Sequence, residues 1–577
     1  MEKQKIVVLK FGGSVLAGED DLPTAVGEIY RWVSNGYRVV AVVSAIGSTT
    51  NRLFNRSHKY GARLNPHTIA RLVSTGEVES AALLGLALDR VGLANEVHDD
   101  TSLQIRTEGD VLDAEITSID STRLSEILKR AEVVVVPGFV GRGQNGMSNL
   151  LGRGGSDLTA LCIAEALGAD HCFLVKDVDG LFEWDPKRSG APRQYQQISI
   201  SSALQLDEAI VQHKAVRLAK RLAIPFHVGS MRSTHVTAVG DFKSDQFYSD
   251  RTRVEPLRIG LLGLGTVGLG VYEQLRRNPM VQVEWVGVRD RSKAVDHGAP
   301  ASITTNDPLP RINDDIELVI ELIGGIEDAY NYVQVALKSG KHVITANKSM
   351  MAAHGVELAE LAAQQGVRLL FSAAVGGGVP MLETVARIAR HDEIVHLEGV
   401  LNGTCNFVLD RVAAGIKFRE AVFSAQREGF AEADPSRDLD GVDAAEKLAL
   451  MIWKATGELN NEDIQAVPVS ENSISQVVSN APGHVIRQVS TWQKPVNGSG
   501  GESHVRLVNV PAGHPFAKLQ GEDNCLKILT ASGKRYQLVG KGAGRFPTSQ
   551  SVLNDLNELL RHLSRQTETL SETPVAI

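Results

Sequence analysis

Acidic side chains and one lysine crowd the stretch EGFAEADPSRDLDGVDAAEKLAL, residues 428–450. Asp443 and Lys447 stand four residues apart, so they share one face of the helix that we expect there. The same face continues through the apolar Leu450 and Met451. A lysine stem on apolar surface beside a carboxylate is a partly desolvated amine of tuned basicity. Such an amine can exchange a proton with a substrate oxygen as a general acid or base.

A glycine-rich turn predicts a dinucleotide site. The apolar stretch Leu257–Leu262 predicts a strand and runs directly into the turn Gly263-Leu264-Gly265-Thr266-Val267-Gly268, which opens a helix. In that setting backbone N–H groups and the helix N-terminus hold a pyrophosphate. Arg289 ends the next predicted strand and can accept a 2′-phosphate, which favours NADP, while the neighbouring Asp290 leaves NAD open.

The two features together predict hydride transfer to a carbonyl. Reduction of an aldehyde needs a proton at the oxygen as hydride arrives at the carbon, and the reverse oxidation needs a base. Lys447 is the candidate for both roles.

Composition narrows the remaining choices. The 577 residues are 43% apolar and 22% charged, which is ordinary for a globular protein of three or four domains. The net charge of −8 gives no footprint for nucleic acid or an anionic membrane, and no stretch approaches the roughly 18 apolar residues of a membrane helix. Four scattered cysteines without CxxC or CxH spacing fit a reducing cytoplasm. We expect a cytoplasmic enzyme that acts on small molecules.

The elements that position these residues form two α/β halves. Continuous Val/Ile/Leu runs predict a mostly parallel sheet in the first half, and a second strand series restarts at Leu257. From about Glu393 the strands look antiparallel, with helical stretches at Phe418–Glu428 and Val442–Lys454 among them. The expected domains are 1–245, a linker at 246–256, a Rossmann domain at 257–392, an α+β catalytic and dimerisation domain at 393–550, and a C-terminal helix and tail at 551–577.

The second half resembles homoserine dehydrogenase from Arg258 to about Leu563. The resemblance rests on stretches such as GKHVITANKSMMAAHG, AAVGGGVP, LEGVLNGTCNFVL and GKGAGRFPTSQSVLNDL. It implies the NAD(P)H-dependent interconversion of L-aspartate 4-semialdehyde and L-homoserine, on the route to threonine and methionine. It makes Lys447 the proton donor and acceptor, with Asp443 orienting it and Lys348 as a second functional lysine near the nicotinamide.

Further residues follow from the same resemblance. Glu432 would bind the substrate amino group, and Asp438 is a candidate for direct substrate contact. The expected cofactor contacts are Thr266, Val267 and Gly542. A monovalent cation, Na⁺ or K⁺, would take the backbone carbonyls of Val375, Gly377 and Val379, although Ser372 stands where the family often has a glutamate. Members of the family usually dimerise, so we expect a homo-oligomer, a dimer or a tetramer.

Two glycine-rich stretches carry the chemistry of the first half. Lys10-Phe-Gly-Gly-Ser14 follows the first predicted strand, and Gly152-Arg-Gly-Gly-Ser-Asp157 precedes a predicted helix. Glycines there let backbone amides approach phosphate oxygens, and Lys10 can neutralise a transferring phosphoryl group. With VVSAIGSTTN, STGEVES and KDVDGLFEWDPKR, these stretches resemble the amino-acid kinase fold, and more closely aspartokinase.

That resemblance implies phosphorylation of L-aspartate to 4-phospho-L-aspartate by Mg-ATP. Lys10 would stabilise the transferring phosphate. The aspartate ligands would be Ser44, Thr50, Glu77, Arg153 and Asp157. The nucleotide would meet Asp177 and the Asp185–Arg188 loop, which includes Lys187.

The first half also departs from the aspartokinase pattern. KFGGSV is one residue shorter than the usual KFGGTSV, Lys176 stands where a threonine is usual, Phe182 replaces a tyrosine, and Ile210 replaces a late lysine. Regulatory ACT domains do not follow, so we expect no feedback of the usual kind. Three interpretations stay open. The first two are a bifunctional enzyme and a dehydrogenase fused to an inactive kinase-like domain that serves binding or assembly. A third is a reductase for another short aldehyde.

Overall fold

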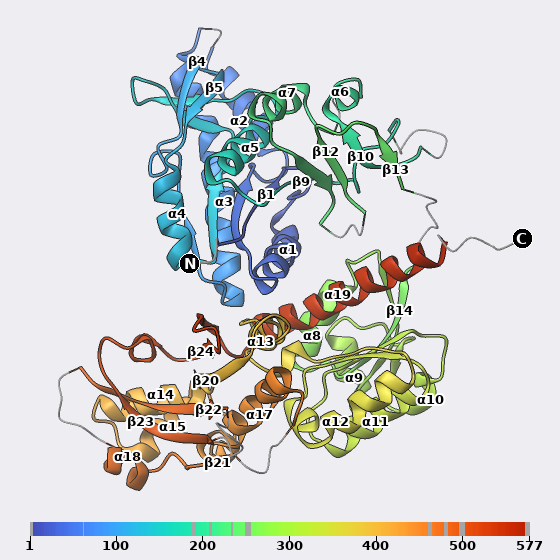
Figure 1. Cartoon of the computed structure of the whole chain (residues 1–577), viewed down its shortest axis with the longest axis vertical. Helices are drawn as coiled ribbons and strands as arrows, with labels where there is room; N and C mark the ends of the chain where they lie inside the picture. The colour runs from blue at the N-terminus through green and yellow to red at the C-terminus, as the bar shows by residue number, and fades with distance from the viewer. Residues whose placement is uncertain are drawn as a thin grey trace, which may run out of the picture. The chain divides into compact units, whose positions relative to one another are not determined.

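The computed structural model describes residues 4–61, 63–185, 192–206, 210–231, 235–248, 255–459, 464–477, 483–494 and 502–571. The chain divides into two compact units, one formed by Met1–Arg253 with Leu560–Ile577 and the other by Val254–Leu559 (Figure 1). Lys187, expected beside a nucleotide, lies outside the described residues. Within the described part of the chain, no helix has the length and apolar character needed to cross a membrane.

A nine-stranded sheet forms the centre of the first unit, in the order β13-β10-β12-β11-β9-β1-β2-β6-β3. Its strands are β1 (Ile6–Phe11), β2 (Arg38–Val43), β3 (Asn95–Val97), β6 (Val133–Pro137), β9 (His171–Val175), β10 (Tyr195–Ser199), β11 (Phe226–Gly229), β12 (Thr237–Gly240) and β13 (Gln246–Phe247). All pairs are parallel except β11 with β12 and β10 with β13. Nearly every residue of β1, β2 and β6 is buried, as continuous Val/Ile/Leu runs require.

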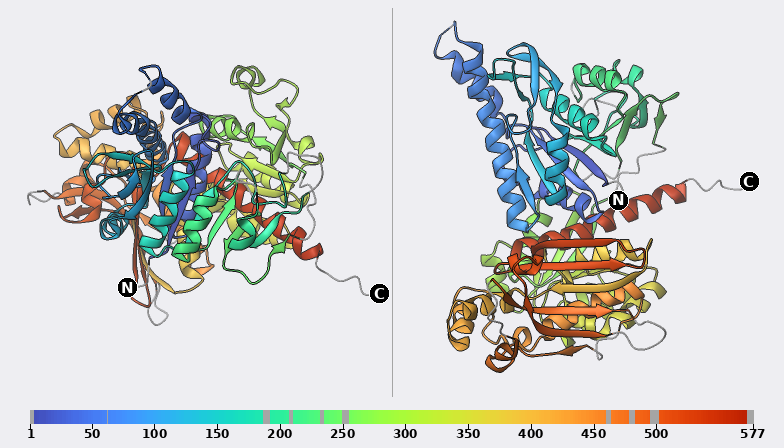
Figure 2. Two further views of the ribbon diagram at one scale, coloured as in Figure 1. Left: turned by 90° about the horizontal axis from the view of Figure 1, so that it is seen from above. Right: turned by 60° about the vertical axis from the view of Figure 1, so that its left-hand side comes forward.

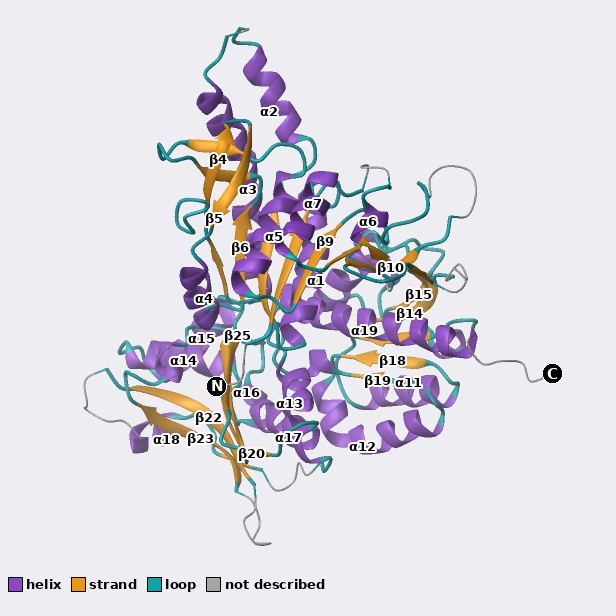
Figure 3. Cartoon of the chain, turned by 45° about the horizontal axis from the view of Figure 1, so that its top comes forward, coloured by secondary structure: helices purple, strands orange, loops and turns teal. Residues whose placement is uncertain are grey.

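Helices cover this sheet, and a smaller sheet stands beside it. Figure 3 separates the helices from the strands by colour. The helices are α1 (Leu22–Ser34), α2 (Thr49–His58), α3 (Pro66–Val91), α4 (Ser121–Arg130), α5 (Gly155–Leu167), α6 (Ile200–Ala203) and α7 (His213–Leu222). The smaller sheet, in the order β5-β4-β7-β8, contains β4 (Arg106–Asp110), β5 (Asp113–Ser118), β7 (Val140–Arg142) and β8 (Ser148–Leu150). Strand β8 leads directly into the glycine-rich turn at Gly152, and α5 follows that turn.

The second unit begins with a six-stranded parallel sheet in the order β16-β15-β14-β17-β18-β19. Its strands are β14 (Leu257–Leu262), β15 (Val281–Gly287), β16 (Thr304–Thr305), β17 (Leu318–Glu321), β18 (His342–Thr345) and β19 (Leu369–Leu370). Its helices are α8 (Thr266–Leu275), α9 (Arg291–Asp296), α10 (Leu309–Ile312), α11 (Glu327–Lys338) and α12 (Lys348–Gln364). The strand order runs outward in both directions from β14, which places the ligand crevice at the carboxyl ends of β14 and β17.

A second six-stranded sheet follows, in the order β21-β23-β22-β20-β24-β25, and it is antiparallel except for the β21–β23 pair (Figure 2). Its strands are β20 (Ile394–Val400), β21 (Gln465–Ala466), β22 (Val485–Gln493), β23 (Ser503–Val510), β24 (Asp523–Thr530) and β25 (Arg535–Lys541). Our sequence analysis missed β22, although it found its neighbours. The helices are α13 (Met381–Ala389), α14 (Gly403–Ala413), α15 (Phe418–Arg427), α16 (Ser436–Leu439), α17 (Val442–Thr456) and α18 (Glu471–Val477). The last helix, α19 (Arg545–Ser571), begins in this unit, and its residues from Leu560 onward belong to the first unit.

One hydrophobic core joins the two sheets of the second unit. Trp285 of the parallel sheet, Leu448 of α17 and Ile528 of the antiparallel sheet belong to the same buried cluster. Helices α12 and α17 approach closely because Gly355 has no side chain, and a Cβ there would lie 2.9 Å from the Trp453 ring. This contact packs the middle of α12 against the last turn of α17.

Candidate active site

Helix α17 carries Asp443 and Lys447, the pair expected on one face of a helix. It starts after Gly441, whose φ of 80° lies in the left-handed region and whose Cβ would approach Ala466 to 3.1 Å. Asp443 Oδ2 lies 2.8 Å from Lys447 Nζ, one turn further along the helix. Asp443 Oδ1 lies 3.0 Å from the Nζ atom of Lys348, the first residue of α12. The fold thus brings all three predicted residues together, and we call them the lysine–aspartate cluster.

Two buried asparagines support this cluster, and sequence analysis did not single out either. Asn402 Nδ2 donates to Asp443 Oδ2 at 2.8 Å and to Asp438 Oδ1 at 2.7 Å. Lys447 Nζ donates to the backbone oxygen of Leu401 at 2.7 Å, and Asn524 Nδ2 donates to the same oxygen at 3.1 Å. Asn402 lies inside the LNGTCNFVL stretch, so the sequence motif could have pointed to it, but its contacts could not be predicted from the sequence.

Asp443 and Lys348 of the cluster favour each other's charged forms. Burial opposes ionisation of Asp443, but Lys447 and Lys348 hold the pKa of its carboxyl well below the usual range. Burial likewise opposes the charge of Lys348, yet Asp443 raises the pKa of that lysine. The pKa of Asp438 is raised, by burial and then by the charge of Asp443. The cluster therefore presents two ammonium groups on one ionised carboxylate, an arrangement that can place a proton donor against a carbonyl oxygen.

Glu432 does not join the cluster. It is exposed on the segment before α16, where Gln426 Nε2 donates to the backbone oxygens of Glu432 and Ala433. Among the described residues no contact links its carboxylate to Asp443. Its expected role with the substrate amino group stays a prediction.

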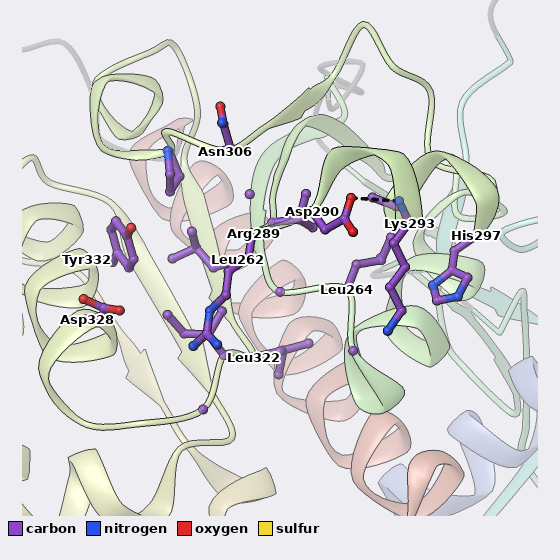
Figure 4. Close-up of a pocket in the computed structure, with 18 residues that line it drawn as sticks. Leu262, Leu264, Arg289, Asp290, Lys293, His297, Asn306, Leu322, Asp328 and Tyr332 are labelled. Atoms are coloured by element: carbon purple, nitrogen blue, oxygen red, sulfur yellow. Dashed lines mark hydrogen bonds between the residues drawn. The ribbon is translucent and has the colours of Figure 1, made fainter.

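The dinucleotide turn borders a cavity of about 570 Å³ at the carboxyl ends of β14 and β15 (Figure 4). Gly263 and Gly265 line it. Gly263 has φ 95°, and a Cβ there would lie 2.6 Å from the Leu322 oxygen. Gly268 serves packing instead, because its Cβ would meet the Gly263 oxygen at 2.1 Å. Neither Gly268 nor the expected cofactor contacts Thr266 and Val267 border the cavity within the described residues.

Arg289, Asp290 and Lys293 also line the cavity. The Asp290 carboxylate caps α9, accepting hydrogen bonds from the backbone of Ser292 at 2.9 Å and Lys293 at 3.2 Å. Figure 4 shows this capping contact beside the exposed Arg289 side chain. The Asp290 carboxylate is thus used to cap α9, while the cationic side chains of Arg289 and Lys293 line the same cavity.

A chain of contacts connects the cavity to the lysine–aspartate cluster. Asn347 Nδ2 donates to the backbone oxygens of Ile323 at 3.3 Å and Gly325 at 2.7 Å, and Ile323 lines the cavity. Asn347 also caps α12 by accepting from the backbone of Met350, and Lys348 follows it directly. The residue that orients the loop at the cavity therefore adjoins the lysine bonded to Asp443.

The residues expected to bind a cation, and the expected cofactor contact Gly542, lie near the lysine–aspartate cluster. Val375, Gly377 and Val379 occupy the turn before α13, where the Val379 oxygen accepts from the backbone of Met381 at 2.7 Å. Gly377 packs against Gly542, and a Cβ on Gly377 would lie 2.7 Å from the Gly542 carbonyl. A Cβ on Gly542 would collide with Asn524, which supports Leu401. Gly542 thus packs against Asn524, which supports the lysine–aspartate cluster through Leu401. It is not a lining residue of the described cavity.

The first unit holds a second charged cluster, formed by Lys10, Asp157 and Lys176. Lys10 Nζ lies 2.8 Å from Asp157 Oδ1 and Lys176 Nζ lies 2.9 Å from Asp157 Oδ2. Asp157 stands in the first turn of α5 and is only 2% exposed. Burial opposes its ionisation, but the two lysines lower its pKa to about 2.

The other residues expected in the kinase site divide into two groups. Ser44 Oγ donates to Ser156 Oγ at 2.9 Å, and Thr50 Oγ1 donates to Glu77 Oε1 at 3.3 Å. Glu77 is buried, and its burial raises the pKa of the carboxyl to about 8 against the opposing effects of the Ala45 N–H and Lys10. The exposed group contains Arg153 and Asp177, with Ser14 Oγ donating to Asp177 Oδ1 at 3.3 Å.

Comparison with known sequences divides the chain in the same way. Residues 5–230 match the amino acid kinase family, residues 263–372 match the NAD binding domain of homoserine dehydrogenase, and residues 380–556 match the homoserine dehydrogenase family. The chain therefore carries an amino acid kinase domain ahead of two dehydrogenase domains.

Individual relatives cover the second part of the chain. The homoserine dehydrogenase of Synechocystis sp. is 33% identical over 336 residues, which are 55% of this chain and 77% of the relative. That of Bacillus subtilis is 34% identical over 291 residues, 49% of this chain and 66% of the relative. The crystal structure of a homoserine dehydrogenase from Thiobacillus denitrificans superposes with a TM-score of 0.50 at 32% identity, covering 54% of this chain and 74% of that one.

Proposed function

The chain belongs to the homoserine dehydrogenase family, and we propose that its second unit interconverts L-aspartate 4-semialdehyde and L-homoserine with NADP as cofactor. The observation that carries this proposal is the run of contacts from the cavity at Ile323, through Asn347 and Lys348, to Asp443 and Lys447. It supports a substrate position between the cofactor and a buried amine.

Each residue has a distinct role in this reaction. NADPH bound at the glycine turn would provide the hydride for the aldehyde carbon. Lys447 donates its proton to the aldehyde oxygen in reduction and takes a proton from the homoserine hydroxyl in oxidation. Asp443 and the Leu401 oxygen hold the Lys447 ammonium in place, and Lys348 binds the substrate beside them. Glu432 is proposed to bind the substrate amino group, and Asp438 is proposed to contact the substrate directly.

NADP is proposed over NAD because of the groups around the cavity. Arg289 and Lys293 offer two positive charges to a 2′-phosphate. Asp290, the acid that could bind a ribose 2′-hydroxyl, is used to cap α9. Thr266, Val267 and Gly542 remain proposed contacts elsewhere along the cofactor.

The dehydrogenase proposal is tested with the purified full chain. Oxidation of NADPH is followed with L-aspartate 4-semialdehyde and with a panel of other three- and four-carbon aldehydes. A strong preference for L-aspartate 4-semialdehyde is expected, and equal rates across the panel would make the chain a reductase of broader scope. Replacing Na⁺ and K⁺ by choline in the same assay tests the proposed cation ligands Val375, Gly377 and Val379. Light scattering on the same sample tests the proposed homo-oligomer.

For the first unit we propose phosphorylation of L-aspartate by Mg-ATP. Lys10 and Asp157 support this role because they form a buried cluster at the start of α5. The second candidate is an inactive kinase-like domain, which is favoured by the departures from the aspartokinase pattern at Lys176 and Phe182. Trapping the acyl phosphate with hydroxylamine distinguishes them, because aspartyl hydroxamate forms only if the phosphoryl group is transferred. No hydroxamate at saturating aspartate and Mg-ATP would leave the second candidate.

A further inference from the structure

Lys176 reaches the same carboxylate as Lys10 from a neighbouring strand. β1 and β9 are parallel partners, with Lys10 opposite Leu174, so both lysines stand at the carboxyl edge of the sheet. The backbone N–H of Lys176 donates to the Gly229 oxygen at 2.8 Å, which fixes the start of its side chain. Lys10 can lie over the glycine turn because Gly12 has no side chain, and a Cβ there would come within 3.0 Å of Lys10 Nζ.

The charges of this cluster do not balance. Two ammonium groups share one carboxylate, and all three side chains are no more than 11% exposed. Glu77 acts on Lys10, but its pKa of about 8 keeps it mostly protonated at neutral pH. Burial lowers the pKa of Lys176, against the opposing charges of Asp157 and of the exposed Asp177. An ion pair that served only the core would cost least if it were neutral, whereas a buried excess of positive charge favours an anion.

Further donors converge on the same place. Within the described part of the chain, Asp157 is the one carboxylate that forms an ion pair with Lys10 or with Lys176, and Lys176 also donates a hydrogen bond to it, so each ammonium keeps N–H groups for another acceptor. Gly154 and Gly152 have φ of 79° and 70°, which turns the chain into α5 and presents the helix N-terminus to the same edge of the sheet. Crevices at the carboxyl ends of parallel strands are where such folds bind ligands.

We propose that Lys176 is a second catalytic lysine of the kinase reaction, which donates with Lys10 to the non-bridging oxygens of the phosphoryl group in transfer. The inference rests on the kinase function proposed above. A β-carboxylate oxygen of aspartate forms the new bond to the γ-phosphorus of ATP, and the bond from that phosphorus to the β,γ-bridging oxygen breaks with its electron pair leaving on Mg-ADP. The attacking carboxylate is already ionised, so no proton moves. Asp157 holds the two ammonium groups on opposite oxygens, ready for the charge that spreads over the phosphoryl group.

The test compares Lys176→Met, Lys176→Arg and Lys10→Met with the full wild-type chain. Hydroxamate formation and ADP release give kcat and the KM values for aspartate and Mg-ATP. Reduction of L-aspartate 4-semialdehyde by the same samples reports whether the protein is intact. Arg130→Met is a control for the loss of a cation elsewhere in the same unit, since Arg130 forms an exposed ion pair with Glu96 at 2.5 Å.

We expect Lys176→Met to lower kcat by about 10²–10³, as loss of one charge-stabilising donor does, with the KM for aspartate changed by less than about threefold. Lys176→Arg should recover part of the loss, and Arg130→Met should keep the wild-type kcat. A kcat for Lys176→Met within about threefold of wild type, or above it, overturns the inference and makes Lys176 a structural partner of Asp157. Absence of hydroxamate with the wild-type chain overturns the kinase proposal and the inference together.

Discussion

Replacing Asp443 by asparagine keeps the shape of the side chain and removes the charge that two lysines share. Its oxygens lie 2.8 Å from Lys447 Nζ and 3.0 Å from Lys348 Nζ. At an effective dielectric constant of about 20, each contact is worth about 6 kcal/mol in gross Coulomb energy. Desolvation offsets much of this, so that breaking a buried pair by removing one partner costs about 3–5 kcal/mol. The variant leaves two ammonium groups that repel one another.

The expected result is a selective loss of turnover. NADPH-dependent reduction of L-aspartate 4-semialdehyde should fall by about 10²–10⁴ in kcat, because Lys447 loses the group that orients it. NADPH affinity, measured by the fluorescence of the bound cofactor, should change little, since Asp443 does not line the described cavity. The melting temperature should fall with the lost ion pairs.

A control variant separates stability from chemistry. Asp410→Asn breaks the contact of Asp410 Oδ1 with Arg487 Nη1 at 2.6 Å, another ion pair of the same domain with a buried arginine. It should lower the melting temperature without a comparable loss of kcat. If Asp443→Asn lowers the melting temperature but keeps kcat within about threefold of wild type, the assignment of Asp443 and Lys447 to catalysis is wrong.

Three further predictions concern charges elsewhere. Because burial raises the pKa of Glu77 to about 8, Glu77 must lose a proton if it binds the aspartate ammonium as a carboxylate. Calorimetry at neutral pH in two buffers should therefore detect proton release on aspartate binding, and Glu77→Gln should abolish that release. Arg289→Ala should raise the KM for NADPH much more than that for NADH, and equal changes would remove the 2′-phosphate contact from the proposal. Burial, and then the charge of Asp555, raises the pKa of Glu383 to about 8, so the stability of the second unit should decline as pH rises from the unfolded-state value through about 8. Glu383→Gln should therefore gain melting temperature over wild type at about pH 9 and little at about pH 5, and a gain that is independent of pH would contradict this.

Local patterns determined much of the architecture. The strand β14 begins and ends at Leu257 and Leu262, as the apolar run predicts, because a strand covered on both faces needs an unbroken run. The left-handed φ of Gly263 and the tight packing of Gly268 follow from the glycine spacing of the turn. The i, i+4 spacing of Asp443 and Lys447 likewise fixed their contact, because helical geometry brings such pairs together.

Other features were hidden because they depend on residues far apart in the chain. Asn402 reaches Asp443 from the N-cap of α14, and Asn524 of β24 shares the backbone oxygen of Leu401 with Lys447. Nothing in the local sequence around either asparagine indicates these contacts. The strand β22 also escaped notice, because its apolar residues are interrupted by the polar Arg487, Gln488 and Ser490, which the fold buries.

By itself the sequence determined the residue types at the two sites, the glycine turns and the order of the α/β elements, since these depend on neighbours within a few turns or a single strand. Only the tertiary structure decided which charges meet. Lys348 reaches Asp443 because one core packs α12 against α17, and Lys176 reaches Asp157 because α5 packs against both β1 and β9. Lys176, which departs from the aspartokinase pattern, shares the Asp157 carboxylate with Lys10. The two lysines meet there because β1 pairs with β9 across a sequence separation that no local pattern can encode.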